Sequence, residues 1–276
     1  MSDVYKCFRH GRYVTKVARE PYPDNPRTMM DNIGIIVVSD RDEYLCDERN
    51  KCSDLEFCFD AFNSWDDAEE WVKKQPNVIA VKPLSVIDHS RVVVYQGDSD
   101  GSWDCSRCGF HVVTRNTCKN ILGPTIAEKA LEGDKDALAK VYECMDQEIN
   151  MLQQYFDGDV WAYHVYEIPD RFKEDAFSDE ELADACKYFE LLDSCYGWYD
   201  KPEEVFEEAV SELSFYVNPV SVVIWYNKDP LIFDNANIAI DYFTEGAMAC
   251  DPGSSESSRY YEIVAELKTG KKFVKG

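Results

Sequence analysis

Residues 31–38 read DNIGIIVV, and this stretch points to the class of fold that the sequence predicts. The run ends in four consecutive branched aliphatic residues, which is the length and composition of a strand buried on both faces. Further strands are predicted at residues 78–87, 91–95 and 110–114, with a short helix at 63–74 among them. Strands and helices mixed in this way favour an α+β fold, with several helices and two or three packed subdomains.

Three of the predicted helices are acidic. The first, at residues 63–74, has Ser64 as its candidate N-cap, and the second covers residues 179–192. The third covers residues 202–213 and begins at Pro202, a residue suited to a first helical position. Its apolar residues recur at helical spacing and predict one buried stripe, formed by Phe206, Val210 and Leu213.

The chain is expected to divide into three parts. Residues 1–30 form an extended, basic, Pro-rich arm, with rough strand character over residues 4–17 before three prolines break regular structure near its end. Residues 31–120 form an α+β domain, and residues 121–276 form a domain of helices and strands. Within the last part the pattern predicts helices at 121–156, a strand at 158–167, a β-rich stretch at 215–226, a short helix at 237–243, a flexible loop at 252–258 and a closing strand at 259–267.

The charge is strongly negative and unevenly distributed. The 276 residues include 29 basic and 53 acidic side chains, a formal net charge of −24. Residues 39–70 hold 12 acidic and 3 basic side chains, and residues 170–212 hold 15 acidic and 4 basic ones. Direct binding of nucleic acid is disfavoured, because it needs Lys and Arg to displace counterions from phosphates, and so is docking on an anionic membrane.

Acidic segments are often no more than solvated faces, and that interpretation stays open. The sharper hypothesis is that they face a basic groove on another macromolecule, where charge speeds association and excludes wrong partners. The partner-binding residues that this hypothesis names all lie on the three acidic helices. They are Asp66, Asp67, Glu69, Glu70, Asp179, Glu180, Glu181, Glu203, Glu204, Glu207 and Glu208.

The best candidate for a metal site is the CxxC motif at residues 105–108. Zinc needs four ligands, and Cys118 and His111 are the donors that could complete a site with Cys105 and Cys108. A second CxxC motif is absent, so reduced, packed thiols are the favoured interpretation. The sequence has no Gly-rich phosphate loop, and we expect neither a metal nor a cofactor.

Asp88-His89-Ser90 places an acid, a base and a nucleophile side by side, but catalytic triads are assembled in space from distant residues. A turn is the better interpretation of this tripeptide. No catalytic residue is assigned, and the protein is expected not to be an enzyme. The alternative is a small-molecule-binding or hydrolytic pocket around His89, Trp103 and His111.

Several short motifs follow one another in the first 200 residues. They are DNIG at 31–34, DHS at 88–90, SWD at 102–104, GFHVV at 109–113, GDVW at 158–161 and DSCYGW at 193–198. In this order and spacing they resemble a family of acidic cytoplasmic proteins encoded by bacteriophages and mobile elements. The chain departs from that family at Arg91, where glycine is common, and at residues 105–108. Its length and its basic, Pro-rich N-terminal arm are similar to phage inhibitors of the Gabija defence system.

The resemblance and the acidity together imply a phage counter-defence inhibitor. It would bind a bacterial anti-phage defence complex, with a DNA-binding nuclease as one candidate, and block its nucleic-acid-binding or active surface. The alternative functions are removal of a defence signal, or an accessory protein whose acidity serves solubility alone. The start of the sequence lacks a signal peptide, and we expect the protein in the host cytoplasm. Abundant aromatic residues predict a homo-oligomer that associates through residues 1–30 and the C-terminal strands.

Overall fold

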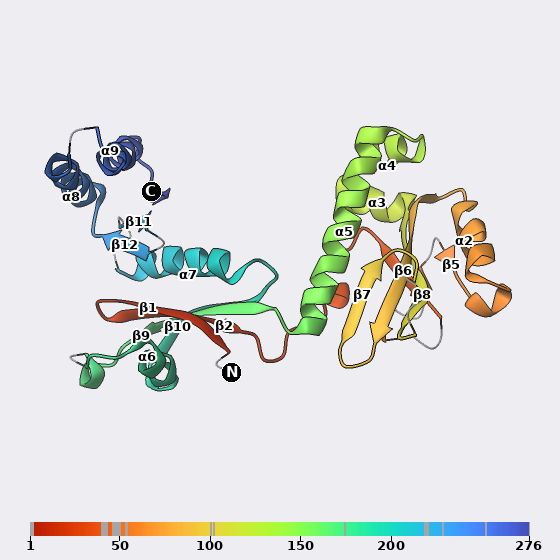
Figure 1. Ribbon diagram of the computed structural model, residues 1–276, viewed down its shortest axis with the longest axis horizontal. Coiled ribbons are helices and arrows are strands. Elements are labelled where there is room, and N and C mark those ends of the chain that lie inside the picture. The colour runs from red at the N-terminus through yellow and green to blue at the C-terminus, as the bar shows by residue number, and fades with distance from the viewer. Residues whose placement is uncertain are drawn as a thin grey trace. The chain divides into compact units, whose positions relative to one another are not determined.

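The computed structural model describes residues 3–39, 44–45, 51–52, 55–99, 101, 103–173, 175–217, 221–227, 229–251 and 253–275. Its helices and mixed sheets confirm the α+β class (Figure 1). The chain forms two compact units: unit 1 comprises Met1–Pro21 and Val160–Gly276, and unit 2 comprises Tyr22–Asp159. The division expected at residues 30 and 120 differs from this one. The N-terminal strands pair with a strand that starts at Trp161, a partner far along the chain that local sequence cannot reveal.

Unit 2 is built on a four-stranded antiparallel sheet in the order β3-β8-β6-β7. The strands are β3 (Ile35–Val38), β6 (Val78–Asp88), β7 (Val92–Gln96) and β8 (Cys105–Thr114). All four residues of β3 are buried, as the run of branched aliphatic residues at 35–38 predicted. Strand β8 begins five residues earlier than expected, and a bulge in its pairing with β6 lies beside Cys108.

Helices cover both faces of this sheet. On one face α2 (Trp65–Lys73) packs Ala68 and Val72 against Phe110 and Val112, together with the hairpin of β4 (Lys51–Cys52) and β5 (Leu55–Glu56) and the 3-10 turn η3 (Phe59–Ala61). The other face is covered by α3 (Arg115–Leu122), α4 (Pro124–Leu131) and the long α5 (Lys135–Asp157). The short α1 (Pro26–Met29) contacts α5.

Unit 1 contains a second antiparallel sheet in the order β1-β2-β9-β10. Its strands are β1 (Val4–His10), β2 (Tyr13–Arg19), β9 (Trp161–Glu167) and β10 (Glu190–Trp198). The strand character expected over residues 4–17 is confirmed by β1 and β2, but these residues are not a separate arm, because they are paired within this sheet. Burial on both faces of the sheet explains why, since Val17 packs in the cluster with α7 and Val14 packs in the cluster with α6.

The remaining elements of unit 1 stack on this sheet as layers, which can be followed in Figure 1. Helix α6 (Asp179–Ala185) and the 3-10 turns η4 (Asp170–Phe172) and η5 (Cys186–Tyr188) pack on one face. Helix α7 (Pro202–Val217) packs on the other face, between this sheet and a small sheet in the order β12-β11-β13. The strands of that sheet are β11 (Val222–Tyr226), β12 (Asp229–Phe233) and β13 (Phe273–Lys275), and its far side is covered by α8 (Ala236–Ala249) and α9 (Ser255–Lys268).

Several predicted elements of unit 1 were wrong in type or length. The closing strand expected at residues 259–267 is helix α9, whose buried Ile263, Val264 and Leu267 lie at helical spacing. The helix expected at residues 179–192 ends at Ala185, and Glu190 already pairs with Glu167 as the start of β10. Residues 215–217 belong to α7, and the short helix expected at 237–243 is the longer α8. Contacts with distant elements decide all of these cases.

Within the described ranges, no helix combines the length and the apolar character that crossing a membrane would require.

Candidate functional site

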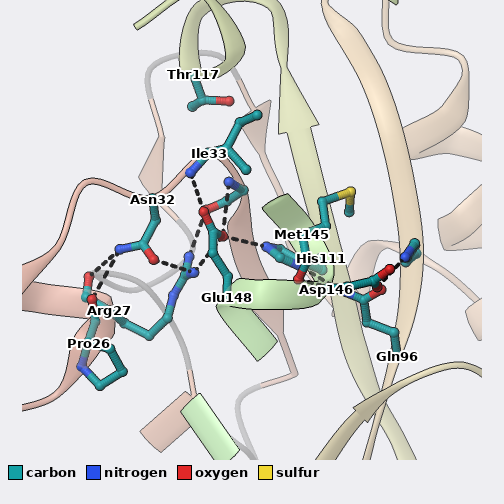
Figure 2. A network of polar contacts seen from close by, with 12 residues as sticks. Pro26, Arg27, Asn32, Ile33, Gln96, His111, Thr117, Met145, Asp146 and Glu148 are labelled. Atoms are coloured by element: carbon teal, nitrogen blue, oxygen red, sulfur yellow. Dashed lines mark hydrogen bonds and ion pairs between the residues drawn. The ribbon is translucent and has the colours of Figure 1, made fainter. Parts of the chain in front are cut away.

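A buried polar network in unit 2 is centred on Glu148 of α5 (Figure 2). Arg27 Nη1 donates to Glu148 Oε2 at 2.9 Å, and the two side chains are 4% and 9% exposed. His111 of β8 is fully buried, and its Nε2 lies 3.0 Å from the same carboxylate oxygen. Burial alone would raise the pKa of Glu148, but the contacts with His111 and Arg27 outweigh it and hold the pKa below its usual value.

The DNIG motif is attached to this carboxylate through its backbone. The N–H groups of Ile33 and Gly34 both donate to Glu148, and Arg27 Nη2 donates to the Gly34 carbonyl at 2.6 Å. A Cβ atom on Gly34 would lie 2.0 Å from the His111 ring, so glycine is required at this position. The motifs DNIG and GFHVV, distant in sequence, therefore meet at one buried site.

Gln96 of β7 completes the network on the other side of His111. Its amide nitrogen donates to the Met145 carbonyl at 2.8 Å and lies 3.2 Å from His111 Nδ1. His111 Nδ1 therefore accepts, and Nε2 is the ring atom that donates to Glu148. The network joins α1, the DNIG turn before β3, β7, β8 and α5, and the side chains of Arg27, His111 and Glu148 are buried. These contacts give the motif residues a role in folding unit 2.

The CxxC residues lie in the core of unit 2. Cys108 Sγ donates to the Leu84 carbonyl at 3.3 Å, and Cys105 Sγ lies 2.8 Å from the Tyr95 hydroxyl. His111, which the zinc hypothesis included, is bound to Glu148 instead. Across the described ranges, no group of three or more His, Cys, Asp or Glu side chains is arranged to hold a metal ion.

The Asp88-His89-Ser90 tripeptide is exposed at the turn between β6 and β7. The His89 ring packs edge-on against Trp103 at 5.2 Å, and Tyr44 is within 3.5 Å of the Asp88 carboxylate. His111 is not part of this group, because it pairs with Lys82, seven residues before His89 along β6 and its turn. That separation is roughly 20 Å at strand spacing. The three residues of the alternative pocket are therefore not assembled.

The acidic residues of α2 are held largely by cations of unit 2 itself. Glu69 is paired with both Lys73 and Arg107, and Glu70 is paired with Lys74 at 2.5 Å. Arg107, which is 9% exposed, also lies 3.8 Å from Asp66. Burial would raise the pKa of Glu69, but the bonds from Lys73 and Arg107 outweigh it and lower that pKa. Asp67 is exposed in the first helical turn, where the helix N-terminus favours an anion.

Helix α6 uses one of its predicted site residues as a cap. Ser178 and Glu181 form a reciprocal capping box, and the Ser178 N–H donates to Glu181 Oε2 at 2.9 Å. This hydrogen bond holds the pKa of Glu181 below its usual value. Asp179 and Glu180 are exposed in the same turn. The acidic face of α6 is therefore short, and part of it stabilises the helix start.

Helix α7 shows the clearest acidic face. Its apolar stripe is buried, and it confirms the predicted Phe206, Val210 and Leu213 while adding Val205 and Ala209. The glutamates flank this stripe in two rows, Glu203 with Glu207 and Glu204 with Glu208, since residues four apart share a face. In the part of the chain that the structure describes, neither Glu204 nor Glu208 has an ion-pair partner.

Asp193 and Glu212 supply further carboxylates near Glu208. Burial and then the nearby carboxylates of Asp193 and Glu208 raise the pKa of Glu212. Burial and the same acidic group raise the pKa of Tyr163 in the sheet below. A raised carboxyl pKa means that its charged form is disfavoured where it lies. Burial together with the neighbouring carboxylates therefore disfavours the charged form of Glu212.

Beside the first row of α7 lies a pocket of about 470 Å³. Tyr5, Phe206 and Trp225 supply three aromatic rings to its lining. Glu203, Glu207 and Asp229 supply three carboxylates, and Lys6 of β1 is the remaining lining residue. Among the described residues, the lining therefore combines three aromatic rings with three carboxylates and one lysine.

The sequence analysis named the glutamates of α7 but did not identify the residues that lie next to them in the structure. Asp193 and Glu212 were counted within the acidic segment 170–212 without being assigned to a site. Tyr5 and Lys6 were placed in the arm, and Trp225 and Asp229 lie beyond the acidic segment. No local pattern could have joined them, because Lys6 and Asp229 are 223 positions apart.

No family model matches the chain, and neither a curated protein nor a solved structure matches it. The likeness to phage proteins therefore depends on the short motifs alone.

Proposed function

We propose that this protein is a non-catalytic phage counter-defence inhibitor. It binds a bacterial anti-phage defence complex in the host cytoplasm and covers the basic surface through which that complex binds nucleic acid. The observation that carries the proposal is the acidic face of α7, whose exposed Glu204 and Glu208 lack ion-pair partners among the described residues. Exposed carboxylates of this kind attract the Lys and Arg side chains of a partner that approaches them.

The chemistry of the competition follows from charge. A nuclease or helicase holds phosphates with Lys and Arg, and carboxylates at helical spacing present those side chains with an alternative set of anions. The motif resemblance directs the choice of target toward DNA-degrading systems, with Gabija first. Acidic faces on α6 and α2 extend the same field more weakly, because Glu181, Glu69 and Glu70 already have internal hydrogen-bond partners.

The proposal is tested by phage plating and then by binding. Producing the chain in bacteria that carry a cloned DNA-degrading defence system should restore phage plating, and the purified complex should exclude duplex DNA. Binding should weaken as salt rises, because attraction between exposed charges is screened beyond about 8 Å at physiological ionic strength. An affinity that does not change with salt, or a complex that still binds DNA, would contradict the proposal.

The second hypothesis, removal of a small-molecule defence signal, has a distinct outcome. It requires chemistry at or near His89, so His89→Ala should abolish relief of defence while leaving protein binding intact. Under our proposal the same variant keeps full inhibition, since the His89 ring packs against Trp103 and lies outside the acidic faces. Loss of a nucleotide signal without any protein complex would favour the second hypothesis.

Self-association remains a prediction. The expected interface at residues 1–30 now includes β1, an edge strand of its sheet, and the C-terminal part presents α9 and β13. Exposed apolar side chains such as Tyr242 and Met248 lie on the neighbouring α8. Light scattering at micromolar concentration should give a mass above that of one chain, and a sharp mass of 31.8 kDa would contradict the prediction.

A further inference from the structure

Two cysteines of unit 1 lie side by side in a buried layer. Cys7 is on β1, and Cys186 is the first residue of η5, directly after α6. Both side chains belong to the cluster that packs α6 on the sheet, where they are 6% and 1% exposed. Both thiols are free, and a hydrogen bond joins them. The two sulfur atoms are therefore in contact, and a disulfide between them needs only a small local shift.

One cation lies beside the two thiols. Lys16 of β2 is opposite Cys7 in the register of β1 with β2. Its Nζ donates to the Ala183 carbonyl in the last turn of α6 at 3.4 Å. The ammonium group thus lies between the strand that carries one thiol and the helix that leads to the other. Its positive charge stabilises the thiolate, which is the nucleophilic form of cysteine.

The two thiols are not equivalent. The hydrogen bond from Cys7 and then the charge of Lys16 outweigh burial and lower the pKa of Cys186. The same hydrogen bond and then burial raise the pKa of Cys7, and the carboxylate of Asp179 adds to that effect. Cys186 is therefore the sulfur that ionises first, while Cys7 keeps its proton.

We propose that Cys7 and Cys186 form a modification site, at which a peroxide closes a disulfide between β1 and η5. The two positions are far apart in the chain, so the cross-link restricts the unfolded chain strongly. It ties the α6 layer, with its exposed Asp179 and Glu180, to the sheet. The cross-link does not require the proposed function, because it needs only the two thiols and a peroxide.

The reaction takes place in two steps. The Cys186 thiolate attacks one oxygen of hydrogen peroxide, so that an S–O bond forms, the O–O bond breaks and hydroxide leaves with the proton that Cys186 gave up. The sulfur becomes a sulfenic acid and has passed two electrons to the peroxide. The Cys7 sulfur then attacks the Cys186 sulfur, an S–S bond replaces the S–O bond, and the departing hydroxide takes the Cys7 proton. Two thiols and one hydrogen peroxide give one disulfide and two water molecules.

Access to the buried sulfurs limits the rate. The layer that covers them consists of short elements, since α6 has seven residues and η4 and η5 have three each. Short surface elements open locally at a lower cost than the rest of a domain. We therefore expect Cys7 and Cys186 to react more slowly than Cys58, whose side chain is exposed.

The first test maps the cross-link in the full chain. The protein is kept in excess hydrogen peroxide until well after Cys58 is fully oxidised, the remaining thiols are blocked with iodoacetamide, and peptides are analysed by mass spectrometry. We expect a peptide pair that joins Cys7 to Cys186 and separates on treatment with dithiothreitol. Cys118 on α3 and Cys144 on α5 are the matched control, because they interact electrostatically and should stay unlinked. Separate alkylation of Cys7 and Cys186 at this point, or a link between Cys118 and Cys144 alone, would overturn the proposal.

The second test assigns the two roles. Serine keeps a hydrogen-bond donor at either position, so both single variants preserve the polar contact. Cys7→Ser removes the second sulfur, and dimedone should then trap a sulfenic acid on Cys186. In Cys186→Ser, the protonated Cys7 should take up about ten-fold less dimedone, because the thiol is a poor nucleophile. Equal or reversed labelling would overturn the assignment of Cys186 as the attacking sulfur.

The third test measures what the cross-link does to the layer. Hydrogen exchange of peptides from β1 and from residues 179–188 should slow by about ten-fold or more in the oxidised chain. The Cys7→Ser variant after the same peroxide treatment should exchange as it did before, since it cannot form the disulfide. Unchanged exchange in a chain whose cross-link has been mapped would contradict the tie between the α6 layer and the sheet.

Discussion

Helices α2 and α7 each carry four of the predicted partner-binding carboxylates, yet they differ in what surrounds those charges. On α2, Glu69 and Glu70 are paired with lysines one turn away, and the mostly buried Arg107 holds Glu69 from β8. On α7, burial and then the carboxylates of Asp193 and Glu208 raise the pKa of Glu212. Equal amounts of acid in the sequence thus give a face in unit 2 that is paired with its own cations, and a face in unit 1 on which Glu204 and Glu208 lack ion-pair partners among the described residues.

The difference shows why charge counts alone do not locate a binding face. A carboxylate that already has an internal cation gains little from an external one, because it must first give up its present partner. A carboxylate held among other acids gains from the first cation that arrives. Replacing Glu by Gln, one site at a time, should therefore change stability in opposite directions for the two classes.

The largest effect is expected at Glu148, a buried carboxylate that contacts both Arg27 and His111. Glu148→Gln should lower the stability of unit 2 by about 3 kcal/mol, because it leaves the buried Arg27 without its counter-charge. Hydrogen exchange of α5 peptides, followed by mass spectrometry, reads this unit separately. Glu143→Gln, on the exposed side of the same helix, should stay within about 0.5 kcal/mol of wild type. Equal protection in the two variants would contradict the account.

Glu148 also sets the pH dependence of unit 2. Its pKa in the folded state is lower than the usual 4.5, so its contribution is complete above about pH 4.5 and is lost as the pH falls through the folded-state pKa. Wild-type unit 2 should therefore lose protection on acidification more steeply than the Glu148→Gln variant does.

An intermediate effect is expected at Glu69. Glu69→Gln should destabilise the packing of α2 by about 1 kcal/mol, because the mostly buried Arg107 keeps only its longer contacts with Asp66 and Asp98. Exchange of α2 peptides gives the measurement. Glu70→Gln, which removes an exposed ion pair from the same helix, should have less than half of that effect. An inverted order would show that Arg107 does not depend on Glu69.

The smallest effect, and the one with the opposite sign, is expected at Glu212. Its pKa is raised in the folded state, so its ionisation opposes folding. That penalty is absent below about pH 4.5, develops as the pH rises through the folded-state pKa and is full above it. Glu212→Gln should stabilise unit 1 at pH 7 by about 0.5 kcal/mol, after allowance for solvent screening. Destabilisation at pH 7 would mean that the acidic group has a cation partner.

The sequence could predict the features that are set by residues close to one another in the chain. Ser64 accepts from the Asp67 N–H as the predicted N-cap, and the buried stripe of α7 follows from spacing within one helix. The β-branched run at 35–38 was recognised as a buried strand for the same reason. The exposed position of the α7 glutamates then follows from the stripe on the opposite side.

What the sequence could not predict depends on partners far along the chain. Helix α9 contains Tyr260, Ile263 and Val264, residues that suit a strand, and it is helical because it packs against α8 and β11. Arg27 was assigned to a basic arm, and only the fold shows that its partner is Glu148, 121 positions away. The compensation of α2 and the pocket beside α7 depend on contacts of the same kind.

The central claim is tested most directly by matched charge reversal on the two helices. One variant changes Glu204, Glu207 and Glu208 of α7 to Lys, and the other changes Asp66, Asp67 and Glu70 of α2 to Lys, so that both alter the net charge equally. Exposed substitutions cost about 0.5 kcal/mol each, and both variants should keep the wild-type circular dichroism spectrum. The α7 variant should lose inhibition of the defence system, with affinity reduced about a hundred-fold, whereas the α2 variant should stay within about three-fold of wild type. Equal losses, or a loss confined to the α2 variant, would contradict the account.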